Sequence, residues 1–494
     1  MEAKKLTIFP ILALLCTSCT VNARNIPTFE KSKGLTFSAY AGPTVAKWDG
    51  SSDNPNTLTP ENMIKLSEAG FNKVIALYEG ASNAKGEDTY DLIEKRSVKA
   101  QKDALIALNA IKEAGVDLKY FVRDWSYYGL VKNYTSGYSP NILTDEQYSI
   151  ITDKMFDEEN EYIRHPNFGG MFTHDEPTYE ELERIAVQVR LYYEKMKELG
   201  IENTEAFVNL YNCTVSDTGL SNQQIVTYEQ YVDRCLELIS PYTGYICFDY
   251  YPFKSNFYDG SYIRNTYVYN LNMLAKKVKE QREKGNDIEL RTFLQSVGNE
   301  TGMRDMVSIG DFRLQIYTEM AFGSHEFIYY EYANARPQTG FGYALFDLKN
   351  NVYNWTYDLA KTVNNEVHAF EDAFLAYNWD GVMYKCADEM LENQALAMLE
   401  GDALESHPRV KIKDCTQDVL MGTFKNDKGD DAFMLVNYTD PYHQLDNEVK
   451  LHFNNAKALL MYRCGQKMIV NLPFSGDYTV KLYPGEGRFI IPIK

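Results

Sequence analysis

One unit recurs along the first two thirds of the chain: an amphipathic helix, then a glycine, then a short apolar strand. Glycine readily adopts the left-handed backbone conformation that ends a helix, so each glycine separates a helix from the strand that follows it. Five glycines stand at such positions, namely Gly70, Gly115, Gly200, Gly285 and Gly323. Eight strands are predicted in all, over residues 35–40, 71–78, 116–124, 169–174, 204–212, 244–249, 290–297 and 326–332.

Helices are predicted between these strands, over residues 144–163, 178–199, 228–240, 267–283 and 310–321. Strands that alternate with helices pair in parallel through right-handed crossovers. Eight such units predict an α/β protein built on a closed (β/α)8 barrel, or TIM barrel. The main alternative is a doubly wound open sheet, which would be expected to carry a glycine-rich phosphate loop after an early strand. Neither GxGxxG nor GxxxxGK followed by Ser or Thr occurs, so the barrel is favoured.

The pattern changes after about residue 375. Short alternating strands are predicted over residues 418–424, 432–437, 448–453 and 488–493, and turns such as Pro484-Gly485 separate them. This pattern predicts a small antiparallel β-sandwich. We expect a barrel domain over residues 30–374 and a sandwich over residues 375–494. The sandwich could bind sugar, but without an obvious exposed aromatic stripe we expect it to brace the barrel.

The N-terminus has the features of a targeting segment. Lys4 and Lys5 precede an apolar stretch over residues 6–15, which is far too short to span a bilayer. Cys19 follows Thr-Ser and resembles the lipidated cysteine of a bacterial lipoprotein, although Cys16 stands where such sites usually carry leucine. We therefore expect a signal peptide over residues 1–19 and an exported protein, in the periplasm or as an outer-membrane lipoprotein attached through Cys19. Plain secretion is the alternative.

The charge of the chain bears on its partners. Sixty-nine acidic residues against 50 basic ones give a net charge of -19, which would repel a phosphate backbone, so nucleic acid is not expected as a partner. The 38 tyrosines suit platforms that bind sugars, because an aromatic ring with a polar hydroxyl matches an amphipathic ligand. Tyrosines spread over helix surfaces and the sandwich would account for most of them equally well.

Polar and aromatic residues gather where the predicted barrel strands end. The clearest case is the segment 168–177, in which an apolar run ends in Asp175, Glu176 and a proline. In a (β/α)8 barrel this face is built by the βα loops and carries the catalytic groups. The other candidates at strand ends are Tyr40, Arg123, Trp125, His174, Asn212, Asp249, Tyr250, Tyr251, Gln295, Tyr330 and Glu331. Packing explains such ionisable groups poorly, because barrel interiors are mostly filled by branched apolar side chains.

The motifs at the ends of strands 4 and 6, Asp-Glu-Pro and Asp-Tyr-Tyr-Pro, together with the trailing β-domain, resemble glycoside hydrolases of the (β/α)8 superfamily. The similarity is greatest to the β-galactosidase-like retaining clan. In that clan an Asn-Glu pair after strand 4 supplies the acid/base. Glu176 matches the glutamate, and Asp175 stands in the asparagine position. The clan's nucleophile is a glutamate ending strand 7, where this chain has Gln295 and Ser296.

The resemblance therefore implies hydrolysis with Glu176 as acid/base and leaves the second carboxylate open. Two carboxyl groups are ordinarily needed, one to protonate the leaving oxygen and one to attack or to activate water. Glu331 ranks first, because its strand faces strand 4 across a barrel. Asp249 follows and could instead orient substrate, and Glu300 lies in the loop after strand 7.

Asp175 and Glu176 are neighbours, so their side chains would point to opposite faces of a strand unless the chain turns there. If both enter the site, their proximity would raise one pKa. Alternatively, they cap the helix that starts near Thr178.

Two functions remain open from the sequence. The first is an exported glycoside hydrolase that acts on an oligosaccharide or polysaccharide, with no metal and no cofactor. The second is a non-catalytic glycan-binding lipoprotein whose barrel has lost hydrolysis. The expected substrate-binding residues are Tyr40, Arg123, Trp125, His174, Asp175, Asn212, Tyr250, Tyr251, Gln295 and Tyr330.

Overall fold

The computed structural model describes residues 26–48, 50–77, 98–124, 127, 144–256, 260–300, 302–335, 340–388 and 393–494. The expected signal peptide, its Cys19 and the strand-end residue Trp125 lie outside these ranges. Within these ranges, the structure contains no helix with the length and apolar character needed to cross a bilayer.

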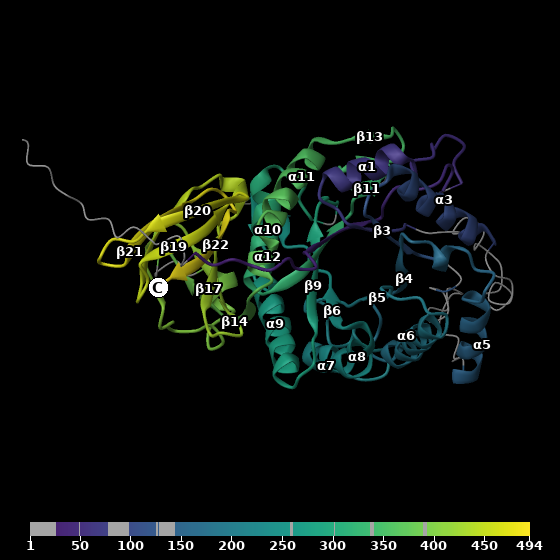
Figure 1. Cartoon of the computed structure of the whole chain (residues 1–494), viewed down its shortest axis with the longest axis horizontal. Helices are drawn as coiled ribbons and strands as arrows, with labels where there is room; N and C mark the ends of the chain where they lie inside the picture. The colour runs from purple at the N-terminus through teal and green to yellow at the C-terminus, as the bar shows by residue number, and fades with distance from the viewer. Residues whose placement is uncertain are drawn as a thin grey trace, which may run out of the picture.

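Eight parallel strands form the first part of the molecule (Figure 1). They are β1 (Thr36–Tyr40), β2 (Lys73–Ile75), β3 (Lys119–Val122), β4 (Phe168–Asp175), β5 (Glu205–Asn209), β6 (Tyr245–Phe248), β9 (Glu289–Gln295) and β10 (Ser324–Tyr330). They are paired in the order β5-β4-β3-β2-β1-β10-β9-β6. The ends of this sheet meet beyond β5, where Leu210 bridges Phe248 in parallel and its N–H donates to the Cys247 carbonyl at 2.9 Å. The (β/α)8 barrel is therefore confirmed, with all eight predicted strands present.

Helices surround the barrel (Figure 1). The long ones are α1 (Pro60–Glu68), α3 (Val98–Ala114), α5 (Asp145–Met155), α6 (Glu181–Glu198), α7 (Tyr228–Leu238), α9 (Tyr267–Glu283), α10 (Ile309–Ala321) and α11 (Trp355–His368). The five glycines predicted to end helices all have positive φ, between 66° and 89°. The helix predicted over residues 144–163 ends early, at Met155, and a short 3-10 turn, η3 (Tyr162–Arg164), follows it.

Several short elements complete the barrel domain. They are α8 (Ser240–Thr243), α12 (Glu371–Phe374), the hairpin of β7 (Phe253–Asn256) and β8 (Gly260–Ile263), and the small sheet of β11 (Ala333–Asn334), β12 (Phe346–Asp347) and β13 (Val352–Tyr353). The hairpin follows β6, and the small sheet follows β10, so both extend the chain beyond the carboxyl ends of barrel strands.

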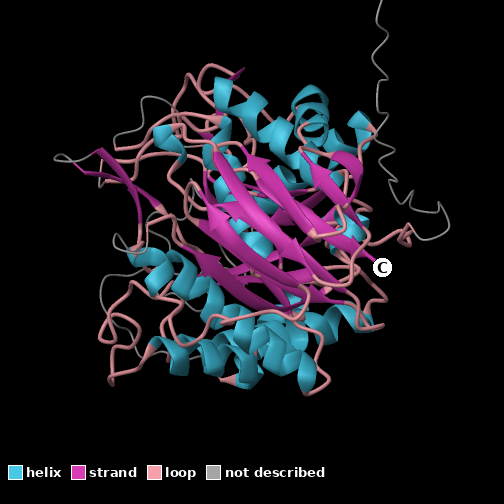
Figure 2. Cartoon of the chain, turned by 90° about the vertical axis from the view of Figure 1, so that its left-hand side faces the viewer, coloured by secondary structure: helices cyan, strands magenta, loops and turns pink. Residues whose placement is uncertain are grey.

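The C-terminal part is a β-sandwich, which faces the viewer in Figure 2. One sheet consists of β14 (Asn378–Lys385), β16 (Val419–Lys425), β17 (Asp431–Asn437), β22 (Gly487–Ile493), β19 (Ala458–Arg463) and β20 (Gln466–Asn471). The other consists of β15 (Val410–Cys415), β18 (Asn447–Phe453) and β21 (Asp477–Leu482), and α13 (Gln394–Ala397) lies in the connection after β14. All pairs are antiparallel, and a separate apolar core fills the space between the sheets. The predicted sandwich is therefore confirmed.

Helix α10 joins the two parts. It packs against β9 and β10 of the barrel on one side and against β16, β17 and β22 of the sandwich on the other. The backbones approach closely, because a Cβ on Gly422 would overlap the Ala321 carbonyl at the end of the helix. Polar side chains that are buried in this contact are mostly hydrogen-bonded. Glu319, for example, accepts hydrogen bonds from Thr292 (2.6 Å) and Tyr267 (2.8 Å).

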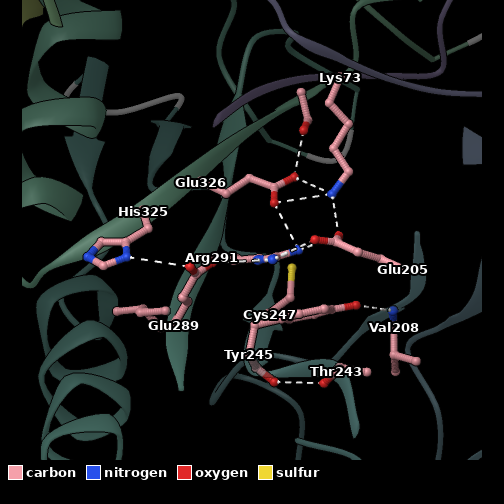
Figure 3. Close-up of polar contacts among 12 residues, drawn as sticks. Lys73, Glu205, Val208, Thr243, Tyr245, Cys247, Glu289, Arg291, His325 and Glu326 are labelled. Atoms are coloured by element: carbon pink, nitrogen blue, oxygen red, sulfur yellow. Dashed lines mark hydrogen bonds and ion pairs between the residues drawn. The ribbon is translucent and has the colours of Figure 1, made fainter. Parts of the chain in front are cut away.

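The barrel interior departs from the expected filling of branched apolar residues. Its N-terminal end holds a buried network of ion pairs (Figure 3). Lys73 Nζ lies 3.1 Å from Glu205 and 3.0 Å from Glu326, and Arg291 Nη1 lies 2.8 and 3.1 Å from the same two carboxylates. Ionisable groups therefore occur at both ends of the barrel. At this end each carboxylate is matched by a cation, and the charge of Arg291 helps to hold the pKa of Glu205 below its ordinary value against the effect of burial.

Candidate active site

Strand β4 is irregular where it delivers the two adjacent carboxylates. Its register against β5 shifts between Phe172 and His174, which marks a bulge. Because of this extra residue, Phe172 and Asp175 both face the barrel interior although they are three positions apart. His174 faces outward instead, with Nε2 4.0 Å from the Glu181 carboxylate of α6, and is fully buried. The structure therefore separates His174 from the interior of the barrel.

The chain turns at Glu176. Its φ is +50°, an uncommon conformation for a residue other than glycine, and its N–H donates to the Asn209 carbonyl at 2.9 Å. Because of this turn, the neighbouring carboxylates Asp175 and Glu176 both lie close enough to Asp249 to raise its pKa. Neither carboxylate caps the next helix, because α6 begins only at Glu181 and its N-cap, Glu180, receives no side-chain cap hydrogen bond.

Asp175 is fixed by groups from three other strands. The Tyr40 hydroxyl donates to its Oδ2 at 3.1 Å, and Asn209 Nδ2 donates to its Oδ1 at 3.0 Å. Arg123 Nη2 lies 3.7 Å from the same Oδ2, while Arg123 Nη1 donates to the Tyr40 hydroxyl at 2.8 Å. The guanidinium lies 4.1 Å from the ring centroid of Phe172, which limits its movement. Asp175 is therefore held in one orientation by Tyr40 of β1, Asn209 of β5 and Arg123, which directly follows β3.

Asp249 follows β6 and is the most perturbed carboxyl of the group. Burial, then the charges of Glu176 and Asp175, raise the pKa of Asp249 well above its ordinary value, and a hydrogen bond with Glu176 acts in the same direction. The carboxyl is only 7% exposed, and its Oδ1 has no hydrogen-bond partner among the described residues. A buried acid beside other carboxyl groups tends to keep its proton, so we expect Asp249 to be protonated next to Glu176 and Asp175.

Aromatic rings surround this pair. The rings of Tyr251 and Tyr330 lie 5.0 Å apart between centroids, and those of Tyr40 and Tyr330 lie 5.8 Å apart. Burial raises the pKa of Tyr330, and the charges of Glu331, Asp175, Asp249 and Glu176 raise it further. Tyr330 therefore lies among all four carboxylates.

Glu331 lies near Tyr330 but has a different partner. Asn334 Nδ2 donates to its Oε1 at 2.9 Å, and its backbone carbonyl accepts the Ser296 hydroxyl at 3.0 Å. Burial raises the pKa of Glu331 to about 7, and the hydrogen bond from Asn334 opposes this rise. Glu300 is exposed. The carboxyl whose pKa the charge of Glu176 raises is Asp249, which we ranked second from the sequence.

Three other predicted site residues form their contacts away from the carboxyl groups. The Tyr250 ring packs 5.3 Å from that of Tyr267, in the core outside the barrel, and its hydroxyl pairs with Thr266 at 2.7 Å. Asn212 Oδ1 accepts from the N–H (3.0 Å) and hydroxyl (2.6 Å) of Thr214, a local turn. Gln295 is fully buried, and both ends of its amide bind backbone groups.

Two residues of the site were missing from the predicted set. Asn209 binds Asp175, and the alternation of β5 could have identified it, because Phe207 two positions earlier faces the interior. Tyr211 is the other. Burial, followed by the charge of Glu176, raises the pKa of Tyr211 to about 12. Among the residues that the structure describes, no three His, Cys, Asp or Glu side chains are grouped to hold a metal ion.

No family model matches the sequence, and no curated protein sequence matches it. Among solved structures, the chain is similar to a glycoside hydrolase of family 5 from Bacteroides vulgatus, at 10% identity over 93% of this chain and 88% of that one, with a TM-score of 0.50. It is also similar to a β-L-arabinopyranosidase of family 27 from Geobacillus stearothermophilus, at 9% identity over 94% and 98% of the chains, with a TM-score of 0.45. A family 51 arabinofuranosidase from Xanthomonas axonopodis pv. citri has 8% identity over 93% and 96%, with a TM-score of 0.44.

Only the first of these similarities reaches a TM-score of 0.50, and at 10% identity it establishes a shared fold alone. At that level the resemblance to (β/α)8 glycoside hydrolases is confirmed.

Proposed function

We propose that this protein hydrolyses glycosidic bonds with Asp249 and Glu176 as its two carboxyl groups. One observation carries the proposal: the buried carboxyl of Asp249 lies close enough to Glu176 and Asp175 for their charges to raise its pKa, at the end of a (β/α)8 barrel where such enzymes place their chemistry. The barrel interior beneath them is rich in aromatic rings. Asp175, held by Tyr40, Asn209 and Arg123, is suited to binding a sugar hydroxyl.

The roles follow from where the proton lies. Asp249 holds it in the resting pair, because its pKa is raised, and can donate it to the leaving oxygen. Glu176 is then the partner that attacks the anomeric carbon, a role that differs from the acid/base role implied for it by the resemblance. Carboxyls about 5 Å apart favour this attack, whereas inverting enzymes need about 6.5–9.5 Å to admit a water. The proximity of Glu176 and Asp249 leads us to expect the shorter separation and hence retention of anomeric configuration, which NMR of the first-formed product would test.

We propose that the protein acts outside the cytoplasm on an oligosaccharide or polysaccharide. The support is the N-terminal pattern of lysines, an apolar stretch and Cys19. Labelling of cells with a fatty-acid probe, with Cys19→Ser as control, tests the lipid attachment. Incorporation that persists in Cys19→Ser would contradict it.

The second candidate is glycan binding without hydrolysis. It is favoured by Gln295, which stands where the β-galactosidase-like clan has its catalytic glutamate. The amide of Gln295 forms hydrogen bonds with backbone groups at both of its ends. A screen of the wild type against aryl glycosides and polysaccharides separates the two functions. Binding of a glycan by calorimetry without any cleavage would establish the second and exclude the first.

Three variants identify the catalytic pair. Glu176→Gln and Asp249→Asn are each expected to lower kcat by about 10²- to 10⁴-fold, the usual contribution of acid–base groups. Glu331→Gln is the matched control, because it alters a buried carboxyl of the same region that binds Asn334 instead. If Glu331→Gln abolishes cleavage while Asp249→Asn does not, the second carboxylate is Glu331.

A further inference from the structure

Gln295 holds together two loops beside the carboxyl pair. Its Oε1 accepts the N–H of Phe253 at 3.0 Å, in the segment after β6, and its Nε2 donates to the Arg304 carbonyl at 2.9 Å, in the loop after β9. Phe253 is fully buried and lies four residues beyond Asp249. The backbone that carries Asp249 and Tyr251 is therefore anchored to the loop that carries Arg304.

Arg304 is in turn held by the β-sandwich. Its Nη2 donates to Asp311 Oδ1 at the start of α10 (2.7 Å) and to Asp440 Oδ1 (2.9 Å). Asp440 stands after β17, immediately before the 3-10 turn η4 (Pro441–His443), and also accepts the Tyr442 N–H at 3.0 Å. The contact is buried, since Arg304 is 7% exposed and Asp440 8%.

The guanidinium of Arg304 also contacts Phe253 directly, at 4.3 Å from the ring centroid. Phe253 is thus held twice, through its N–H by Gln295 and through its ring by Arg304. A buried cation keeps its carboxylate partners because their loss would leave the charge uncompensated. Asp440, together with Asp311, therefore fixes the position of Arg304, and Arg304 in turn packs against the Phe253 ring.

We propose that Asp440 of the β-sandwich is a positioning residue for the carboxyl pair, acting through Arg304, Gln295 and Phe253 on Asp249 and Tyr251. The sandwich then does more than brace the barrel, because it sets the distance between Asp249 and Glu176. The catalytic consequence rests on the proposed function, whereas the effect on the Phe253 segment does not.

Hydrogen exchange of the full chain tests the positional part. In Asp440→Ala, the Phe253 amide and its neighbours through residue 256 are expected to exchange at least about tenfold faster than in the wild type. The amides of β16 and β17 should be unchanged, which shows that the sandwich is intact. Asp414→Ala is the matched control, because Asp414 forms an exposed ion pair with Lys450 in the same sandwich and should leave Phe253 unaffected.

Asp440→Asn guards against a variant that fails to fold. It keeps an oxygen for the Arg304 and Tyr442 donors and removes only the charge, so an intermediate increase in exchange is expected. Phe253 exchange at the wild-type rate in a folded Asp440→Ala, or in Asp440→Asn if the alanine variant does not fold, would overturn the proposal.

Kinetics test the catalytic part on a substrate found in the screen. Misplacement of Asp249 is expected to lower kcat by about 10- to 100-fold with a smaller change in KM. It should also move the basic limb of the pH–rate profile to lower pH, because a better-hydrated Asp249 loses its proton more easily. Loss of folded protein alone would lower the rate without moving the basic limb of the pH–rate profile. A basic limb at its wild-type pH would therefore overturn the proposed effect of Asp440 on catalysis. If the wild type cleaves nothing while Phe253 exchange rises, the proposed function fails and the positioning role stands.

Discussion

Asp249 shows the cost of keeping a protonated acid inside a folded protein. Burial and the charges of Glu176 and Asp175 raise the pKa of Asp249 above its unfolded value, so the folded state binds more protons than the unfolded state between the two values. The stability that this group contributes is fully present below the unfolded pKa and is lost as the pH rises through the folded pKa.

Asp249→Asn should remove this pH-dependent loss. We expect the variant to be more stable than the wild type at pH 8 by about 0.5–2 kcal/mol, as is common where a substitution relieves a strained functional site, while its activity falls. Near pH 2.5 the advantage should vanish, because that pH lies well below the unfolded pKa of about 3.9 and the wild-type acid is then neutral in both states. Urea unfolding at the two pH values measures the difference, and an equal advantage at both would contradict this account.

The Tyr40 hydroxyl links Arg123 to Asp175, so its removal should affect both packing and function. Tyr40→Phe leaves a buried Arg123 donor without that acceptor, and we expect a loss of about 1–3 kcal/mol in the free energy of unfolding. Activity should also fall about tenfold as Asp175 loses its orientation. Tyr329→Phe is the control, because that hydroxyl donates to Asn364 outside the barrel. It should lower stability without lowering kcat.

At the scale of secondary-structure elements, side chains from several barrel strands form ion pairs at the N-terminal end of the barrel, where an apolar layer was expected. Lys73 lies between Glu205 and Glu326 and is 4.1 Å from the Phe121 ring centroid, so it is desolvated and paired on several sides. Lys73→Met should cost about 3–5 kcal/mol, because it leaves buried carboxylates short of a cation. The exposed pair of Lys413 and Asp477 provides the comparison, and Lys413→Met should cost less than about 1 kcal/mol. Equal losses in denaturant unfolding would contradict the difference.

The same scale shows what the sequence could predict. All eight barrel strands were predictable because each is a local apolar run, and five of them follow a glycine that ends a helix. The site was less predictable, because backbone irregularities decide which side chains point into the barrel, and these irregularities leave no signal in the local sequence. The bulge in β4 turns His174 outward and Asp175 inward, and the turn at Glu176 brings two neighbours to one site. Local sequence also does not show that Tyr251, and not Tyr250, packs against Tyr330 in the site, or that Asn334 binds Glu331. Both outcomes depend on residues of other elements.

At the scale of the whole molecule, the barrel and the sandwich share α10 and so should unfold together. A Cβ at Gly422 of β16 would overlap the Ala321 carbonyl, where backbone meets backbone and neither side can yield cheaply. We expect Gly422→Ala to cost about 1–3 kcal/mol or more and to accelerate hydrogen exchange in β9 and β10 as well as in β16.

Gly429 offers a matched control, because it lies in a turn of the same sandwich with φ of +76° and no heavy atom within 4 Å of an added Cβ. Gly429→Ala bears only the backbone strain of about 1–2 kcal/mol, and its effect on exchange should stay local to that turn. If Gly422→Ala loosens the sandwich while β9 keeps its wild-type protection, the two parts unfold independently. Contacts from the sandwich, including that of Asp440 with Arg304, could then open without disturbing the barrel that carries the carboxyl pair.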